Sequence, residues 1–407
     1  MTRNHVVCPR CSAPLVVRAP EVPWCSACEW NLAAFDRLTV PTAWGNRLLD
    51  RAAHRVAFWL DDYGFRRLAG KPVRRRGGRF GRALLLGFSA LVVALGPASL
   101  IGGVYLMLKG PGATPILGLV LTLLAVAVRP RLTRGLPDDM WVVTRESAPT
   151  LYAVLDRTAA AARAPMPDVV GFAADVNASA SRRGRRRVLC VGLPLWAALP
   201  PQQRIALLGH ELGHFVNGDV RSIGLVASAR HTLSTLIDAL GIALFRVLGP
   251  LAIPLMLPLD LMLTLLLVLG QRDGQRAEYL ADQIGSEVAG AKATADLLDF
   301  ALIAADLVPT LMALHGRAAR PDDWRTAGEQ ALRNTPDLEQ LRQRSLRTQA
   351  SLLATHPPAG RRARMAHAHP DQPPAVTMSE PEAQRIDTEL SSCYDRLRAR
   401  AAEAAYT

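Results

Sequence analysis

Long apolar stretches alternate with polar, periodic segments along this chain of 407 residues. Residues 83–108 carry no charged side chain, and a helix of that length measures about 39 Å at a rise of about 1.5 Å per residue. Because the hydrocarbon core of a bilayer is about 30 Å thick, this stretch is long enough to cross it with some tilt. The pattern predicts four spans in two hairpins, over residues 83–108, 110–128, 223–245 and 250–269.

The second hairpin is open to another interpretation. Its apolar runs are shorter, and Asp238 and Asp260 interrupt them. A carboxylate inside a membrane is costly unless it faces protein or water. A pair of buried helices in a soluble core is therefore the alternative for residues 223–270.

Charge predicts how the hairpins are oriented. The net charge is +13, and arginines gather beside the apolar stretches at positions 74, 75, 76, 79, 82, 129, 131, 134, 221, 230, 272 and 276. The turn inside each hairpin holds one basic residue, Lys109 or Arg246. Since cytoplasmic loops are enriched in Lys and Arg, we expect a multi-pass protein of the plasma (inner) membrane, with both termini and the metal site in the cytoplasm. These clusters also explain much of the positive charge, so nucleic acid is not expected as a partner.

The segment LLGHELGHFVNGD, residues 207–219, lies between the two hairpins. Pro201 favours a first helical turn, and apolar residues then recur at helical spacing. His210 and His214 therefore project from one face, one turn apart. Two imidazoles so placed bind one metal ion, and Glu211 is placed to take a proton from water. Because HExxH also arises by chance, the site needs a third ligand.

The segment QRAEYLADQIG, residues 275–285, supplies a candidate for that ligand. Glu278 and Asp282 are four residues apart, on one face of a helix. Glu278 would complete a His-His-Glu zinc site that keeps a position for water, and Asp282 would orient a ligating histidine. Taken alone, the acidic pair is more typical of a solvated helix face, and it is the presence of HExxH that favours a ligand.

The combined motifs resemble those of the HtpX-type integral-membrane zinc metallopeptidases, relatives of the CAAX prenyl proteases. The resemblance rests on HELGHFVNGD, the hydrophobic hairpin after it, RAEYLAD, and THPPAGRRARM, and it covers roughly residues 70–370. It implies a zinc endopeptidase that cleaves membrane or misfolded proteins in protein quality control. The roles it implies are zinc ligands for His210, His214 and Glu278, catalytic base for Glu211, and support of a ligand for Asp282.

Two further segments carry weaker matches. DVNASAS resembles an Asn-Ala-Phe-Ala segment of that family, which implies that Asn177 lies beside the substrate cleft, although Ser179 stands at the Phe position. THPPAGRR resembles a His-Pro-Pro segment followed by an arginine. This match implies that His356 and Arg362 stabilise the transition state or hold the substrate. A surface turn made by the two prolines is the alternative for His356.

Four cysteines near the N-terminus predict a second metal site, at Cys8, Cys11, Cys25 and Cys28. The pattern CxxC-x13-CxxC predicts a zinc ribbon with a structural Zn2+, because four thiolates leave no position for water. Disulfides are the alternative, which a cytoplasmic N-terminus disfavours. The resemblance does not include a ribbon, so binding of a partner, a substrate or nucleic acid stays open for it. Cys190, in an apolar strand, is expected to be a buried side chain rather than a reactive thiol.

Residues 41–69 combine apolar positions at helical spacing with arginines along another side. They predict either an interfacial helix on the anionic inner leaflet or an amphipathic helix packed on protein. Residues 168–181 and 187–196 predict two strands joined by RRGRRR, and their edge suits an extended substrate. That arginine turn either contacts anionic lipid headgroups or is solvated.

The sequence thus predicts a mainly α membrane protein with four transmembrane helices, a zincin-type α+β catalytic domain with a small sheet, and an N-terminal zinc ribbon. The expected parts are the ribbon 1–35, a basic amphipathic linker 36–82, hairpins 83–128 and 223–270, catalytic parts 129–222 and 271–370, and a mobile tail 371–407. Protein or peptide substrates and the bilayer are the expected partners, and the sequence indicates no oligomeric state. A non-proteolytic metal-binding membrane scaffold or sensor is the alternative function, and a membrane-tethered nucleic-acid binder is a third.

Overall fold

The structure is a computed structural model that describes residues 6–40, 42, 45–73, 79–129, 135–137, 139–217, 219–315, 320–335, 337–354, 356–368 and 372–404. It consists of two compact units. Unit 1 comprises Met1–Arg75, Gly135–Gly218 and Gly274–Thr407, and unit 2 comprises Arg76–Arg134 and Asp219–Asp273. The expectation of a mainly helical chain with a small sheet is confirmed.

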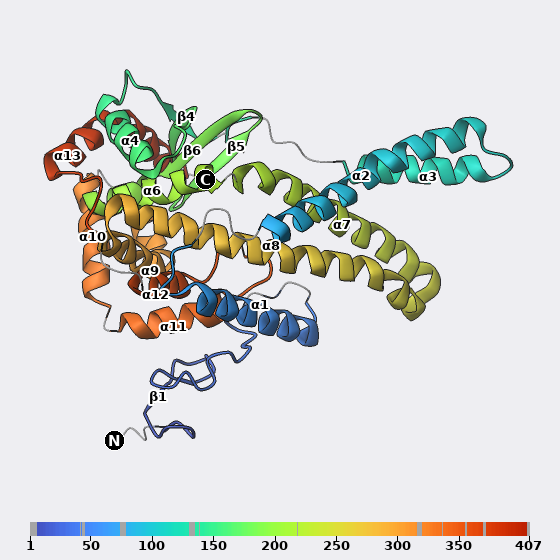
Figure 1. Cartoon of the computed structure of the whole chain (residues 1–407), viewed down its shortest axis with the longest axis horizontal. Helices are drawn as coiled ribbons and strands as arrows, with labels where there is room; N and C mark the ends of the chain where they lie inside the picture. Colours follow the sequence, from blue (N-terminus) through green and yellow to red (C-terminus); the bar gives the residue numbers. More distant parts are fainter. Residues whose placement is uncertain are drawn as a thin grey trace. The chain divides into compact units, whose positions relative to one another are not determined.

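Unit 2 is built from apolar helices, which form two hairpins (Figure 1). Its elements are α2 (Arg79–Lys109), α3 (Thr114–Ala127), α7 (Asp219–Leu248), the 3-10 turn η1 (Gly249–Leu251) and the first part of α8 (Ala252–Ala289). The α2–α3 hairpin is tight, because a Cβ on Gly103 would lie only 2.7 Å from the carbonyl oxygen of Gly118. Leu85 and Val92 of α2 pack on Ala229 and Leu233 of α7 and on Leu266 of α8.

Two helical stretches of the described residues are long and apolar enough to cross a membrane. They are Phe80–Lys109, with a mean hydropathy of 2.2, and Gly224–Ala289, with 2.3. Only 17% and 22% of their most apolar windows are buried. A helix in the core of a soluble protein would hide most of its apolar side chains, so this exposure favours helices that face lipid.

The return helix of the first hairpin is shorter than the predicted span 110–128. Helix α3 has 14 residues and is therefore about 21 Å long. The preceding residues form a turn in which Gly112 has a φ of +57°, a conformation that glycine adopts without strain. Arg74, Arg75, Arg76, Arg131 and Arg134, which entered the orientation argument, lie outside the described residues.

Unit 1 packs helices around a small sheet. Its helices are α1 (Arg47–Leu68), α4 (Pro149–Ala162), α5 (Leu193–Ala198), α6 (Pro201–Asn217), the end of α8, α9 (Ala291–His315), α10 (Pro321–Arg333), α11 (Leu338–Thr348), α12 (Ala359–Ala368), α13 (Glu380–Glu389) and α14 (Ser391–Ala404). Two short strands, β1 (Leu15–Val16) and β2 (Trp24–Cys25), pair near the N-terminus.

The main sheet has four strands in the order β3-β4-β6-β5. They are β3 (Trp141–Val143), β4 (Val169–Ala173), β5 (Ala178–Arg183) and β6 (Arg186–Gly192), and only the β4–β6 pair is parallel. The prediction of one strand over 168–181 is wrong, because the chain bends after Ala173. The second predicted strand ends at Gly192, where α5 begins, since Pro194 has no N–H to offer a sheet.

The C-terminal segment is packed rather than loose. Ile386, Leu390, Tyr394 and Leu397 recur at helical spacing in α13 and α14, and all four are buried. The expectation of a mobile tail is therefore wrong for residues 380–400. Asp387 of α13 also accepts hydrogen bonds from Arg204 of α6, at 3.0 and 3.1 Å, and both side chains are buried.

Candidate active site

The two histidines of HExxH lie on the buried face of α6. His210 and His214 are 5% and 9% exposed, and their Nε2 atoms are 3.2 Å apart. Two nitrogens bound to one tetrahedral zinc ion at about 2.0–2.1 Å would be separated by about 3.3 Å. The observed separation therefore fits two ligands of a shared ion.

A carboxylate from α8 faces this pair. Glu278 Oε1 is 3.5 Å from His214 Nε2, and Oε2 is 3.6 Å from His210 Nε2. All three side chains offer atoms within 4.8 Å of one another. Glu278 Oε2 is buried and accepts no hydrogen bond from the described residues, so it retains the lone pairs that a metal ion would use. This donor set fits zinc.

Small residues allow α6 and α8 to approach closely enough for this geometry. A Cβ on Gly213 would lie 3.0 Å from the Cα of Ala281, and one on Gly209 would lie 3.1 Å from the Cα of Gly285. A larger side chain at either position of α6 would push the helices apart. The spacing of the three candidate ligands therefore depends on this contact.

Asp282, one turn beyond Glu278, supports the first histidine. Its Oδ1 lies 2.9 Å from His210 Nδ1, so the ring presents Nε2 to the metal position. Arg362 of α12 donates to both carboxylate oxygens, at 2.8 Å from Nε and 2.7 Å from Nη2. Burial alone would raise the pKa of Asp282, but Arg362 and then His210 lower it to about 2.

His356 and Arg362 complete the cluster around Glu278. His356 Nδ1 is 2.8 Å from Glu278 Oε1, and Arg362 Nη1 is 3.3 Å from Oε2. Burial opposes the ionisation of Glu278, yet Arg362 and then His356 hold its pKa well below the ordinary range of a glutamate. The two side chains differ in exposure, since that of His356 is 51% exposed and that of Arg362 is 13% exposed.

Glu211 is buried beside His210, with 5% of its surface exposed. Its charge is felt at Cys190 of β6, where burial first and then Asp175, Asp139 and Glu211 raise the pKa of the thiol to about 11. Cys190 is half-buried. A pKa this high favours the protonated thiol at neutral pH, which agrees with the expectation of an unreactive thiol.

Asn177 lies immediately before β5. Its carbonyl oxygen accepts a hydrogen bond from Gly192 N–H at 2.6 Å, and its side chain accepts one from Ala178 N–H at 2.9 Å. The following strand, β5, lies against α6. It is the last strand in the sheet order, and no described strand pairs with its outer side.

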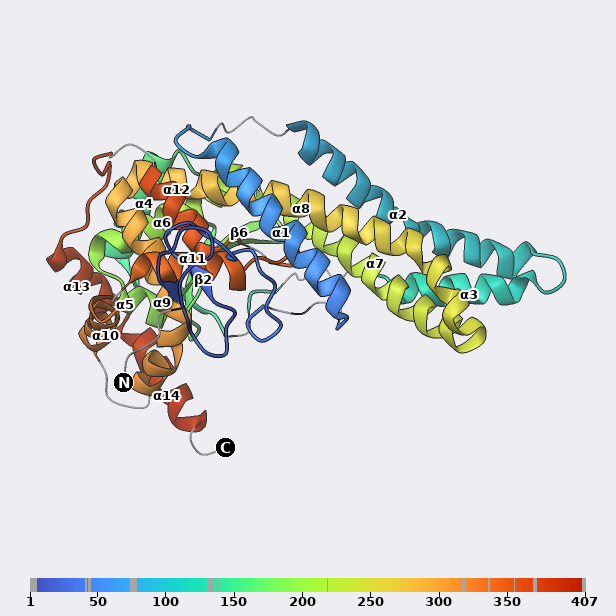
Figure 2. The same cartoon turned by 90° about the horizontal axis from the view of Figure 1, so that it is seen from below.

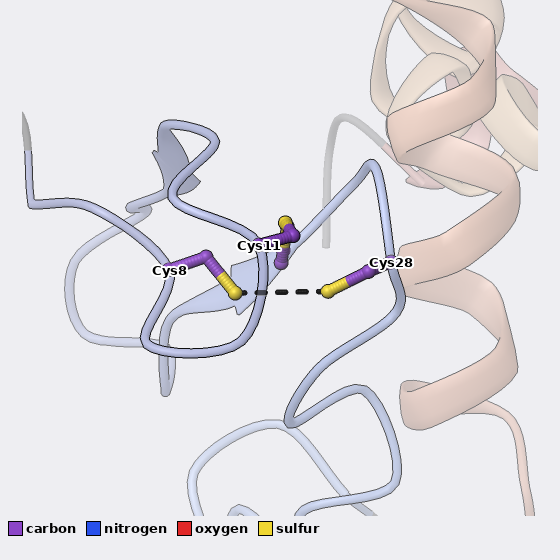
Figure 3. A group of neighbouring side chains, drawn as sticks. Cys8, Cys11 and Cys28 are labelled. Atoms are coloured by element: carbon purple, nitrogen blue, oxygen red, sulfur yellow. Dashed lines mark hydrogen bonds between the residues drawn. The ribbon is translucent and has the colours of Figure 1, made fainter.

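The four N-terminal cysteines converge in a second cluster, and Figure 3 shows three of them, Cys8, Cys11 and Cys28. Cys8 Sγ is 3.6 Å from Cys28 Sγ, and Cys11 Sγ is 3.5 Å from Cys25 Sγ. Four sulfurs around one zinc ion at about 2.3 Å would lie about 3.8 Å apart. The cluster thus fits a four-thiolate metal site, and all four cysteines are free of disulfides.

The residue that holds this cluster in place was not predicted from the sequence. Arg347 of α11 is 1% exposed, and its guanidinium donates to the carbonyl oxygens of Val22, Asn31 and Leu32. Nothing in the pattern around Arg347 distinguishes it from a solvated arginine, because its acceptors are backbone atoms more than 300 residues away.

Eight residues were predicted for the catalytic site. Six of them, His210, His214, Glu278, Asp282, His356 and Arg362, form one cluster, and Glu211 lies next to it on α6. Asn177 is the eighth.

No solved structure matches the chain significantly. The model of Peptidase family M48 matches residues 146–369, which is more than half of the chain and includes α6, α8 and α12. The chain therefore belongs to peptidase family M48, a family of zinc metallopeptidases.

Proposed function

We propose that this protein is an HtpX-type, membrane-bound zinc endopeptidase that hydrolyses membrane or misfolded proteins in protein quality control. The observation that supports it most is the convergence of His210, His214 and Glu278 on one point, with Glu211 beside them. A metal-binding scaffold needs the three ligands but has no use for a buried carboxylate next to them.

Zinc at this site would acidify water and polarise the scissile carbonyl. Glu211 accepts the proton of the attacking water and passes it to the leaving amine. His356 is the group that faces the substrate, because half of its side chain is exposed while Nδ1 is held by Glu278. It donates a hydrogen bond to the oxygen that becomes negative in the transition state. Arg362 contacts the carboxylates of Asp282 and Glu278, and its role is to position Asp282.

The substrate binds in extended form along the outer side of β5. Among the described residues no strand pairs with the outer side of β5, and β5 lies against the HExxH helix. Main-chain hydrogen bonds to an edge strand bind peptides with little regard to sequence, which suits an enzyme that clears many proteins. Asn177, at the start of β5 and exposed, contributes a side-chain amide to that cleft.

Four spans attach the protein to the plasma (inner) membrane, with both termini and the catalytic residues in the cytoplasm. Apolar α2 and the α7–α8 stretch support this proposal. Helix α1 also supports attachment to the membrane, because one side of it exposes apolar residues. These are Leu48, Leu49, Val56, Trp59 and Tyr63, which are 41% to 75% exposed. Arginines 47, 51, 55, 66 and 67 of the same helix match an anionic leaflet.

The location of α1 is tested by hydrogen exchange of residues 47–68 in lipid nanodiscs. We expect slower exchange with anionic lipid than with neutral lipid. Equal exchange in both would favour a helix that packs on protein alone. The opposite side of α1 is buried at His54, Ala57 and Leu60, so part of the protection will be independent of lipid.

The proposed activity is tested with the purified full chain, casein as an unfolded substrate, and the variant Glu211→Gln. Glu287→Gln, an exposed acid on α8, is the matched control. We expect cleavage by the wild type and by the control, none by Glu211→Gln, and about two zinc ions per chain in all three. Zinc without cleavage in every protein would favour the scaffold or sensor. A single zinc ion that His210→Ala leaves unchanged would refute the catalytic site.

A further inference from the structure

The cysteine cluster is docked on the helices that complete the active site. Arg347 of α11 donates to the carbonyl oxygens of Val22 at 2.5 Å, Asn31 at 2.9 Å and Leu32 at 3.2 Å. Its guanidinium also lies over the ring of Trp24, 5.0 Å from the centroid. Figure 2 shows the N-terminal segment beside α11 and α12. A buried arginine with several carbonyl acceptors is a specific contact rather than a loose one.

The contact reaches the metal-binding loops themselves. Trp24, which precedes Cys25, donates from its indole nitrogen to Gln343 Oε1 at 3.0 Å. Gln343 in turn donates to the carbonyl oxygen of Ser26, between Cys25 and Cys28, at 2.9 Å. Trp24 is 1% exposed and Gln343 is 2% exposed. The position of α11 is therefore tied to the loop that carries the second pair of cysteines.

The cluster also contacts α12. Glu29, directly after Cys28, is 2.7 Å from Arg364 Nη1. Arg364 is two residues beyond Arg362, so the two side chains leave α12 on opposite sides. One reaches the ribbon, and the other reaches Asp282 and Glu278.

Helices α11 and α12 are packed tightly against each other. Gly360 N–H donates to Ser345 Oγ at 2.8 Å, and a Cβ on Gly360 would lie only 2.1 Å from the carbonyl oxygen of Arg342. The segment between the two helices carries His356. Whatever holds α11 in place thus also holds His356 and Arg362.

We propose that the ribbon, defined as residues 6–35 with a metal ion on its four cysteines, is a positioning element of the active site. A module of this size has too small a core to fold without its metal. Loss of the metal would disperse the three carbonyl acceptors and the Trp24 ring that cover Arg347, so its guanidinium would turn to water and the contact that holds α11 would be lost. The α11–α12 pair would then shift, and His356 and Arg362 would leave Glu278 and Asp282. This proposal rests on the proposed function for its effect on catalysis, but not for its effect on α11 and α12.

The test uses the full chain with Cys25→Ser/Cys28→Ser, which removes the ribbon metal. Arg10→Gln, an exposed arginine of the same ribbon, is the matched control. Zinc per chain, hydrogen exchange of residues 338–368, and kcat and KM for casein are measured together. In the cysteine variant we expect one zinc ion lost, exchange at 338–368 at least about tenfold faster, and kcat lowered about 10–100-fold with a smaller change in KM. The control should match the wild type in every readout.

A second variant separates positioning from a general failure to fold. Arg364→Gln leaves the cysteines intact and should keep both zinc ions while lowering kcat several-fold. Unchanged exchange at 338–368 in the cysteine variant, or faster exchange with unchanged kcat, would overturn the proposal. If the wild type cleaves nothing, the proposed function is refuted, but the proposed role of the ribbon is not. Exchange at 338–368 and the zinc affinity of the histidine site, weaker in the cysteine variant than in the control, then decide the proposal.

Discussion

Replacement of Asp282 by Asn should weaken the catalytic metal site without removing any of its ligands. Asp282 holds His210 through a 2.9 Å contact and holds Arg362 through two hydrogen bonds. An asparagine keeps the size of the side chain and one acceptor, but it loses the charge that makes the histidine a better ligand. Loss of such a partner typically costs 10–100-fold in metal affinity, which is about 1.4–2.7 kcal/mol.

The structure points to the upper end of that range. Arg362 Nη1 already lies 3.3 Å from Glu278 Oε2. Without the carboxylate of Asp282, the arginine is free to turn towards Glu278 and to compete with the metal for its third ligand. We therefore expect about 100-fold weaker zinc binding in Asp282→Asn. Part of that affinity should return in Asp282→Asn/Arg362→Gln, which removes the competing cation.

The assay is dialysis of the full chain against zinc buffers of stepped free concentration, followed by a zinc count per chain. The wild type should lose zinc in two steps, and the catalytic step alone should move in the variant, because the four cysteines are untouched. Thermal unfolding with zinc in excess checks that the fold is retained. A catalytic step that does not move in a stably folded variant would refute the assigned role of Asp282.

Three shorter predictions concern the packing and chemistry of unit 1. Asp387→Asn should lower the free energy of unfolding by about 3–5 kcal/mol, because it leaves Arg204, which is 0% exposed, without its charge partner; a urea titration that shows less than about 1 kcal/mol would contradict this. Gly213→Leu should lose the catalytic zinc and keep the ribbon zinc in a metal count, since even a Cβ would lie 3.0 Å from Ala281 Cα. Iodoacetamide should alkylate Cys190 about 100-fold more slowly at pH 8 than a thiol of the ordinary pKa of 9.0, because its own pKa is about 11. The rate, followed by peptide mass spectrometry, should rise about tenfold per pH unit until that pKa, and a rate without pH dependence would contradict the raised pKa.

The parts of the site that lie on one helix could be predicted from the sequence alone. A helix fixes which side chains share a face, so His210 with His214 and Glu278 with Asp282 follow from i and i+4 spacing. Pairing the two helices is a tertiary event, so the residues offered Glu278 only as a candidate third ligand, and the resemblance added support for that role. A physical signal was nevertheless present, because Gly209 and Gly213 lie on one face of α6 and match the small residues of α8. Small residues four apart are typical of helices in close contact.

The strand boundaries and the packing of the C-terminal segment were harder to predict from the sequence, for different reasons. Residues 168–181 were predicted as one strand, but the chain bends near Asp175 and Asn177, so that β4 pairs with β6 rather than with β5. Which strands pair is decided by long-range contacts, and no local pattern reports them. The C-terminal segment has apolar residues at helical spacing diluted by charged ones, so its composition suggests a solvated tail. Its burial follows from the Arg204–Asp387 pair, whose members are 183 residues apart.

Arg347 shows why the connection between the ribbon and the active site has no local signature. In sequence it is one arginine among several on a polar helix, and such residues are usually solvated. Its burial is offset because three backbone carbonyls of the N-terminal segment accept its hydrogen bonds. In the proposal above, a metal ion on the four cysteines gives that segment its shape. The three acceptors are therefore in place only after the ribbon has folded, and only then does Arg347 stabilise the contact between the ribbon and α11. A chain that lost the cysteines but kept Arg347 would lose both the acceptors and the cover of this guanidinium, and with them the contact that holds α11 beside the helix that carries Arg362. This physical dependence ties the two metal sites, some 200 residues apart in the sequence, to each other.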